Sequence, residues 1–245
     1  MAVAFDPSFN GESGGEARRV SSPEIFIEDF SAGVDYLGTL PYVDRECIGA
    51  LGVCGYGGFA LGAAQIDARI KAVATSAIYD INGANRDGWQ HSATDADRRA
   101  AIQGYSEQRW KDVDAGEAEV IRGFPEEPIA EVPADLDPIS AEFFEFYATE
   151  RGHHPRAIGG FTTNSWPAHI NFGALRSLPD IAPRPILLIT GENAHSRYFS
   201  DDVYAQASEP KELVVVPGAR HIDLYDRVDL IPFDKIAAFY SQHLG

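Results

Sequence analysis

Cysteine is scarce in this chain of 245 residues, which contains only Cys47 and Cys54. Two cysteines cannot build the disulfide framework on which small secreted domains depend. We therefore expect reduced thiols and a cytoplasmic setting. The sequence also lacks the C-x-x-C and H-E-x-x-H spacings that are typical of metal ligands, and we expect no metal and no cofactor.

Basic residues and long apolar runs are equally sparse. Lys and Arg number 20 against 37 Asp and Glu, which gives a formal net charge of -17. Nucleic acids and anionic membrane surfaces are bound through clustered basic residues, so we expect neither as a partner. No apolar run approaches the length of a membrane-spanning helix, and residues 1–6 lack the features of a signal peptide.

Apolar runs of strand length alternate with helical patterns along most of the chain. A single α/β domain over residues 1–245 with a mostly parallel sheet flanked by helices is the fold class that this alternation predicts. The polar, aromatic-rich segment 80–180 interrupts the alternation, and we expect it to be a helical lid insertion. Residues 3–5 read as the end of a strand that runs into a Gly-rich loop. The other expected strands are 48–53, 70–77, 185–191 and 211–217, and the expected helices include 22–39, 59–68, 95–110, 140–147, 202–208 and 230–244.

The segment IGALGVCGYGG at residues 48–58 carries most of the functional information. A strand, a sharp turn with small residues and a helix form the context of a nucleophile elbow, G-x-Nuc-x-G, with Cys54 as the nucleophile. The start of the following helix would favour the thiolate. Tyr56 departs from the pattern, because it stands at the last small position. The same residues also fit a buried structural thiol in a tightly packed junction.

A histidine in the expected place follows the last strand. His221 comes after the turn at Gly218, where the general base of an α/β hydrolase projects over the strand ends. The acid that orients such a histidine usually follows the preceding strand. In this chain the usual position of the acid falls near Ala194, which has no carboxylate. We therefore select Glu192, two residues earlier, as the first choice. Other carboxylates that could take the role are Asp80 as second choice, then Asp201 and Asp202.

Aromatic and polar side chains cluster near the expected mouth of the site. We assign substrate contacts to Tyr56 in the elbow, to His195 in the turn after the expected strand 185–191, and to Trp166 in the insertion. Packing within loops and the lid is the alternative explanation for each of them.

Several loops resemble those of α/β hydrolases related to dienelactone hydrolase. The similar segments are residues 4–15, 52–55, 151–157, 191–198 and 218–226. The group includes uncharacterised bacterial hydrolases and fungal polyketide transferase-like proteins. The resemblance implies a nucleophile at Cys54, a base at His221, an oxyanion-hole N–H from Gly55, and chemistry on ester, thioester or lactone bonds.

Two departures from this group lead to further expectations. Its members usually have Gly at the position of Tyr56. They also begin with further strands and a Gly-rich loop that supplies an oxyanion donor, so N-terminal strands are expected to be missing here. Three explanations fit the missing strands: the chain is a truncated member of the group, it has an alternative start, or it restores the missing sheet edge by association. An exposed sheet edge would favour a homodimer.

The sequence thus predicts a hydrolase that acts on a small-molecule acyl substrate through a Cys54 acyl-enzyme. A catalytically impaired binding protein and an acyltransferase on the same fold are the alternatives.

Overall fold

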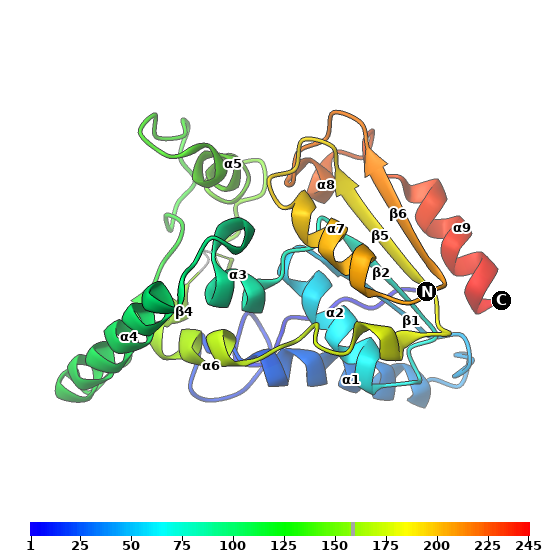
Figure 1. Ribbon diagram of the computed structural model, residues 1–245, viewed down its shortest axis with the longest axis horizontal. Coiled ribbons are helices and arrows are strands. Elements are labelled where there is room, and N and C mark those ends of the chain that lie inside the picture. The colour runs from blue at the N-terminus through cyan, green and yellow to red at the C-terminus, as the bar shows by residue number, and fades with distance from the viewer. Residues whose placement is uncertain (158–159) are drawn as a thin grey trace. The chain divides into compact units, whose positions relative to one another are not determined.

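Among the described residues, four parallel strands form the main sheet in the order β1-β2-β5-β6 (Figure 1). Every residue of the two central strands, β2 and β5, is buried, as expected for strands that are covered on both faces. The predicted α/β fold with a parallel sheet is thereby confirmed. The strands are β1 (Gly49–Val53), β2 (Ala72–Ser76), β5 (Ile186–Gly191) and β6 (Lys211–Val216).

The computed structural model describes residues 1–157 and 160–245, and it divides into two units. The core unit consists of Pro23–Ala84 and Phe172–Gly245 and contains the main sheet. The helical unit consists of Met1–Ser22 and Asn85–Asn171. Its second segment lies inside the range 80–180 that was expected to be an insertion, and its role as a lid stays a prediction.

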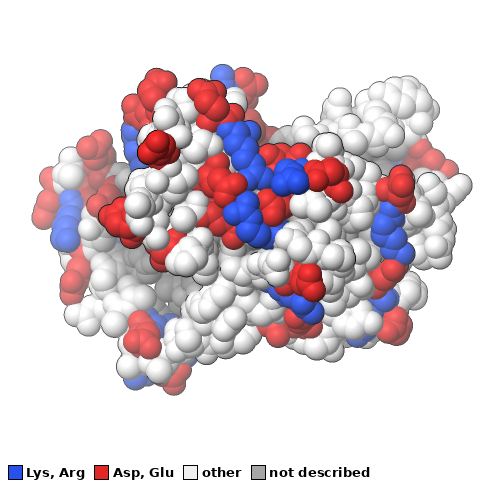
Figure 2. Space-filling model, turned by 90° about the horizontal axis from the view of Figure 1, so that it is seen from above, with Lys and Arg blue, Asp and Glu red and all other residues white. Residues whose placement is uncertain are grey.

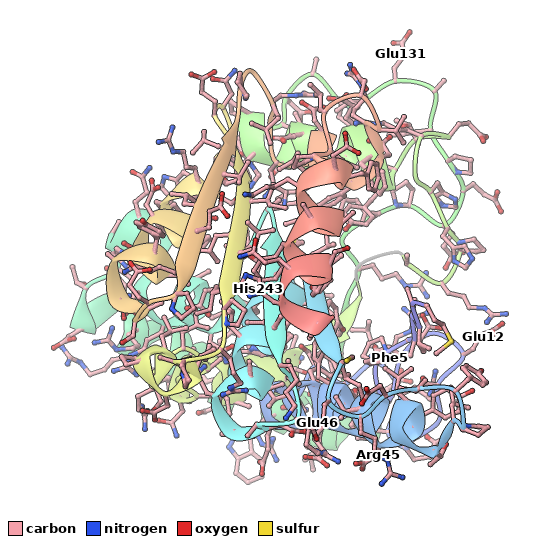
Figure 3. The ribbon with its side chains drawn as sticks, turned by 90° about the vertical axis from the view of Figure 1, so that its right-hand side faces the viewer. Phe5, Glu12, Arg45, Glu46, Glu131 and His243 are labelled. Atoms are coloured by element: carbon pink, nitrogen blue, oxygen red, sulfur yellow. The ribbon has the colours of Figure 1, made fainter. Side chains whose placement is uncertain are left out.

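Helices cover both faces of the sheet in the core unit (Figures 1 and 3). On one face, α9 packs on a buried cluster that includes Ala74, Leu187 and Phe239. The Tyr240 hydroxyl of α9 donates a hydrogen bond of 2.6 Å to the carbonyl of Ala50 in β1. The other face is contacted by α2 and α7. The helices of this unit are α1 (Pro23–Thr39), α2 (Gly55–Ile66), η3 (Leu178–Ile181), α7 (Arg197–Gln206), α8 (Asp223–Asp226) and α9 (Phe233–Leu244).

The helical unit begins its longest helix with a capping box. The Thr94 hydroxyl accepts from the Asp97 N–H while the Asp97 carboxylate accepts from the Thr94 N–H, and Gly116 ends the helix with a φ of 76°. A two-stranded antiparallel ribbon lies in the same unit. The elements of this part of the chain are α3 (Ile81–Asp87), which crosses the unit boundary, η1 (Trp89–His91), α4 (Asp95–Ala115), β3 (Val120–Ile121), α5 (Pro138–Tyr147), β4 (Phe161–Thr162), η2 (Thr163–Ser165) and α6 (Trp166–Asn171).

The expectation of a strand at residues 3–5 is wrong. These residues have no regular structure, and Val3 and Phe5 are 41% and 44% exposed. Apolar residues of high strand propensity need a neighbouring strand to pair with, and this segment has none among the described residues. The loop that follows folds on itself, because the Asp6 carboxylate accepts a hydrogen bond from the Glu12 N–H.

The surface carries the acidic excess of the sequence. On the face in Figure 2, acidic side chains are spread widely, and basic groups lie beside them. In the part of the chain that is described, no helix combines the length and apolar character that a membrane crossing needs.

A buried histidine holds the two segments of the helical unit together. His169 Nε2 lies 2.8 Å from the Ser21 hydroxyl, and both residues are buried. The Ser21 N–H donates to the Ser165 hydroxyl at 2.9 Å. Burial lowers the pKa of His169 to about 4, so its imidazole is neutral at physiological pH.

This buried imidazole predicts acid-sensitive stability of the helical unit. Its pKa rises from about 4 when folded to its ordinary 6.5 when unfolded, so the unfolded state binds the proton first. Stability is complete above pH 6.5, and we expect a loss of about 3 kcal/mol as the pH falls toward 4.

Tryptophan fluorescence during urea unfolding measures this effect, because Trp89, Trp110 and Trp166 all lie in the helical unit. In His169→Gln the pH-dependent loss should disappear, whereas the exposed His154→Gln should keep it. An unchanged pH dependence in His169→Gln would contradict the prediction.

Candidate active site

Cys54 occupies a sharp turn between β1 and α2. Its backbone has φ 54° and ψ -128°, a conformation that residues with a side chain rarely adopt. Two hydrogen bonds hold the turn against the end of β2: the Cys54 N–H donates to Ser76 O at 3.0 Å, and the Tyr79 N–H donates to Cys54 O at 2.9 Å. Strand, strained residue and helix are the context of the nucleophile elbow that the sequence predicts.

The elbow accommodates the large side chain of Tyr56 but leaves no space for a side chain at position 52. A Cβ atom at Gly52 would lie 2.2 Å from the Tyr56 carbonyl oxygen. The Tyr56 ring instead packs against Phe26 and Phe59, with centroids 5.7 and 5.6 Å away. The departure from the motif is therefore absorbed by packing toward α1, and substrate contact by Tyr56 stays a prediction.

His221 is buried after β6, and both of its ring nitrogens are engaged. Nε2 lies 2.7 Å from the hydroxyl of Tyr225, and Nδ1 lies 2.5 Å from the hydroxyl of Ser196. The Tyr225 hydroxyl also hydrogen-bonds the side chain of Cys54. The structure thus brings Cys54 and His221 into one network, which runs through Tyr225.

Glu192, the predicted acid, makes a different contact from those of this network. The exposed Glu192 carboxylate accepts a hydrogen bond of 2.9 Å from the Gly218 N–H. Asp80 accepts from the Asn82 N–H at the start of α3. A hydroxyl, that of the almost fully buried Ser196, therefore stands where a carboxylate was expected.

The other two weaker candidates for the acid lie on α7. Asp201 makes an ion pair of 3.5 Å with Arg197, and the Asp202 carbonyl accepts from Gln206. Ser196 immediately precedes this helix. A search restricted to carboxylates passes over it, although it lies in the same turn as Glu192.

Two more aromatic rings surround His221. The His195 ring lies 4.8 Å from that of His221, and the Tyr79 ring lies 6.1 Å from it. His195 therefore lies beside His221, and its substrate contact stays a prediction. Sequence reasoning missed Tyr79 and Tyr225. The only available signal for Tyr225 was its spacing of four residues from His221.

Burial determines the protonation state of the Cys54 thiol. It raises the pKa of the Cys54 thiol, and the hydrogen bonds with Tyr225 and with the Gly55 N–H lower it by less. The expected preference for thiolate at the start of α2 is outweighed, so the resting thiol carries its proton at neutral pH. Gly55 directly follows Cys54 in the turn, and its role as an oxyanion donor stays a prediction.

The remaining predicted site residue belongs to the helical unit. Trp166 begins α6, and its ring contacts those of Phe161 and His169. Its substrate contact stays a prediction. Within residues 1–157 and 160–245, no group of three His, Cys, Asp or Glu side chains could hold a metal ion.

Comparison with known sequences finds relatives over the whole chain. The chain is 46% identical to the uncharacterised protein PA2218 of Pseudomonas aeruginosa over 249 residues, which cover all of this chain but only 65% of PA2218. It is 36% identical to the uncharacterised protein YcjY of Escherichia coli over 227 residues, 92% of this chain and 73% of YcjY. The thiohydrolase aneE of Aspergillus aculeatus is 42% identical over 71 residues, 29% of this chain and 22% of aneE. No model of a protein family matches.

Solved structures have the same fold. The crystal structure of PA2218 superposes with a TM-score of 0.91 over 98% of this chain and 74% of that one. The α/β hydrolase GrgF from a Penicillium species superposes with a TM-score of 0.76 at 21% identity, over 98% of this chain and 78% of GrgF.

The elbow predicts a large difference between two glycine substitutions. Gly52→Ala places a methyl group against the Tyr56 carbonyl, which cannot move without changing the elbow, so we expect a loss of about 1–3 kcal/mol in unfolding free energy. Gly104→Ala in α4 meets no atom within 4 Å and should gain up to about 1 kcal/mol.

Urea unfolding followed by circular dichroism measures both effects. Equal stability of the two variants would contradict the close approach at Gly52. The rate at which Cys54 reacts with a thiol reagent should also differ from the wild type in Gly52→Ala and equal the wild-type rate in Gly104→Ala.

Proposed function

This chain belongs to the same family as the uncharacterised proteins PA2218 and YcjY and has the α/β-hydrolase fold, and we propose that it hydrolyses ester, thioester or lactone bonds through an acyl-enzyme on Cys54. The observation that carries the proposal is the strained Cys54 elbow, linked by hydrogen bonds to a buried histidine. The partial similarity to a protein named as a thiohydrolase favours thioesters among these substrates.

The residues of the core unit can be assigned to the steps of acyl transfer. His221 removes the Cys54 proton, and the thiolate attacks the carbonyl carbon of the substrate. The Gly55 N–H stabilises the oxyanion that forms. The leaving alkoxide or thiolate then takes the proton from the imidazolium. Water, activated by His221, releases the acid and restores the thiol.

Ser196 gives His221 an orientation without a negative charge. When Nε2 accepts a proton, Nδ1 carries a hydrogen and donates it to the Ser196 hydroxyl. A carboxylate at this place would also stabilise the imidazolium by its charge, which a hydroxyl cannot do. The arrangement therefore suits activated acyl groups with good leaving groups, such as thioesters, better than amides.

The two cysteines provide a matched test of the nucleophile. We expect Cys54→Ala to abolish turnover of a short-chain nitrophenyl ester and of an acyl thioester, because no other thiol lies in the elbow. Cys47→Ala, which removes an exposed thiol, should keep wild-type turnover. Mass spectrometry of the quenched reaction should locate the acyl group on Cys54.

Turnover that survives in Cys54→Ala would contradict the mechanism. An absence of turnover in the wild type with both substrates would favour a binding protein, and acyl transfer to an added alcohol or amine in preference to water would favour an acyltransferase.

The residue that orients His221 is tested separately. Ser196→Ala leaves the buried Nδ1–H without its acceptor, at a cost of about 1–3 kcal/mol, and should lower kcat by about ten- to hundred-fold. Glu192→Gln keeps an oxygen that can accept from the Gly218 N–H and should change kcat little. A large loss in Glu192→Gln with a small one in Ser196→Ala would restore Glu192 as the acid.

A further inference from the structure

A tyrosine hydroxyl stands between the two residues that must exchange a proton. Tyr225 Oη lies 2.7 Å from His221 Nε2, and the same hydroxyl is hydrogen-bonded to the Cys54 side chain. We propose that Tyr225 is a catalytic residue that relays the proton from Cys54 to His221. The proposal rests on the proposed function of Cys54 as the nucleophile.

The short helix α8 fixes the tyrosine against the histidine. The Tyr225 N–H donates to Ile222 O at 3.1 Å, and the Leu224 N–H donates to His221 O at 3.4 Å. The start of the turn is locked by Asp223, whose carboxylate accepts from the Arg220 N–H at 2.9 Å and from its guanidinium at 3.1 Å. The histidine and tyrosine rings are 5.3 Å apart and inclined by 69°, which directs the hydroxyl at Nε2.

The donors along the network can all point the same way. A hydroxyl can donate one hydrogen bond while it accepts others. In the proposed relay, the S–H of the neutral thiol donates to the Tyr225 oxygen, the Tyr225 O–H donates to Nε2, and Nδ1–H donates to the Ser196 oxygen. This direction selects the Nδ1–H tautomer, in which the lone pair of Nε2 accepts the hydrogen bond from Tyr225 and can take up its proton. Once the thiolate has formed, the Tyr225 hydroxyl donates to the sulfur, which is the direction that lowers the thiol pKa.

The relay transfers two protons and no other atoms. The S–H bond of Cys54 breaks as a bond forms from that hydrogen to the Tyr225 oxygen, while the original Tyr225 O–H bond breaks as the N–H bond at Nε2 forms. A thiolate and an imidazolium result, and the tyrosine is again neutral. The reverse transfer carries the proton back when the thiol is restored.

Tyr225→Phe tests the relay, because the ring is kept and only the hydroxyl is lost. We expect the rate of acylation in a single turnover to fall by about a hundred-fold with little change in KM, since proton transfer and not binding is affected. The pH profile of Cys54 alkylation by iodoacetamide should move to higher pH, because a hydrogen bond that stabilises the thiolate is removed. Tyr42→Phe, at a tyrosine that is 71% exposed, is the matched control and should match the wild type.

A proton inventory of the wild-type acylation rate in mixtures of H2O and D2O gives a second test that needs no variant. Two protons in flight predict a curved dependence on the deuterium fraction, and a linear dependence would overturn the relay. This measurement decides the matter if circular dichroism shows that Tyr225→Phe does not fold.

The two proposals fail in different ways. Wild-type acylation and an unshifted pH profile in a folded Tyr225→Phe, together with an inactive Cys54→Ala, would overturn the relay and leave the nucleophile in place. Full activity in Cys54→Ala would overturn both.

Discussion

The strained backbone of Cys54 is the constraint on which the rest of the site depends. A positive φ at a residue with a side chain is maintained only when its surroundings compensate for the strain. Here the end of β2 and the loop that follows it supply hydrogen bonds to the N–H and the carbonyl of Cys54. The space for the turn comes from Gly52, where any side chain would meet the Tyr56 carbonyl. Tyr56 can be large because its ring packs away from the turn, on Phe26 and Phe59.

Burial and hydrogen bonding together determine how this thiol can react. Burial favours the neutral thiol of Cys54, so the proposed nucleophile needs a base to remove its proton. His221, the proposed base, is in contact with a serine hydroxyl and a tyrosine hydroxyl, and both contacts are uncharged. Under the proposed function, such a site would keep its thiol protonated until a substrate binds, and it would suit acyl groups that need little charge stabilisation.

The sequence was sufficient for the elements with a strong local pattern and insufficient for contacts that depend on loop geometry. The four strands, the Cys54 turn and the position of His221 could be predicted because apolar runs, small residues and chain order identify them. Ser196 and Tyr225 could not, because hydroxyl residues are common in turns and only the folded loops bring them to the imidazole. Residues 3–5 illustrate the opposite error, since strand propensity without a pairing partner produced no strand.

The interleaving of the two units also determines the order in which the protein can assemble on the ribosome. Each unit is built from two separate segments of the chain, and β2 pairs with β5, where Val73 lies opposite Ile186. β1 and β2 therefore emerge long before β5. The strand β5 emerges only after residues 85–171 of the helical unit have been made. Until then the inner edge of β2 is open to wrong pairings, as is typical of topologies with many distant contacts. Folding of the Cys54 turn, which is anchored on β2, is thus tied to the synthesis of β5.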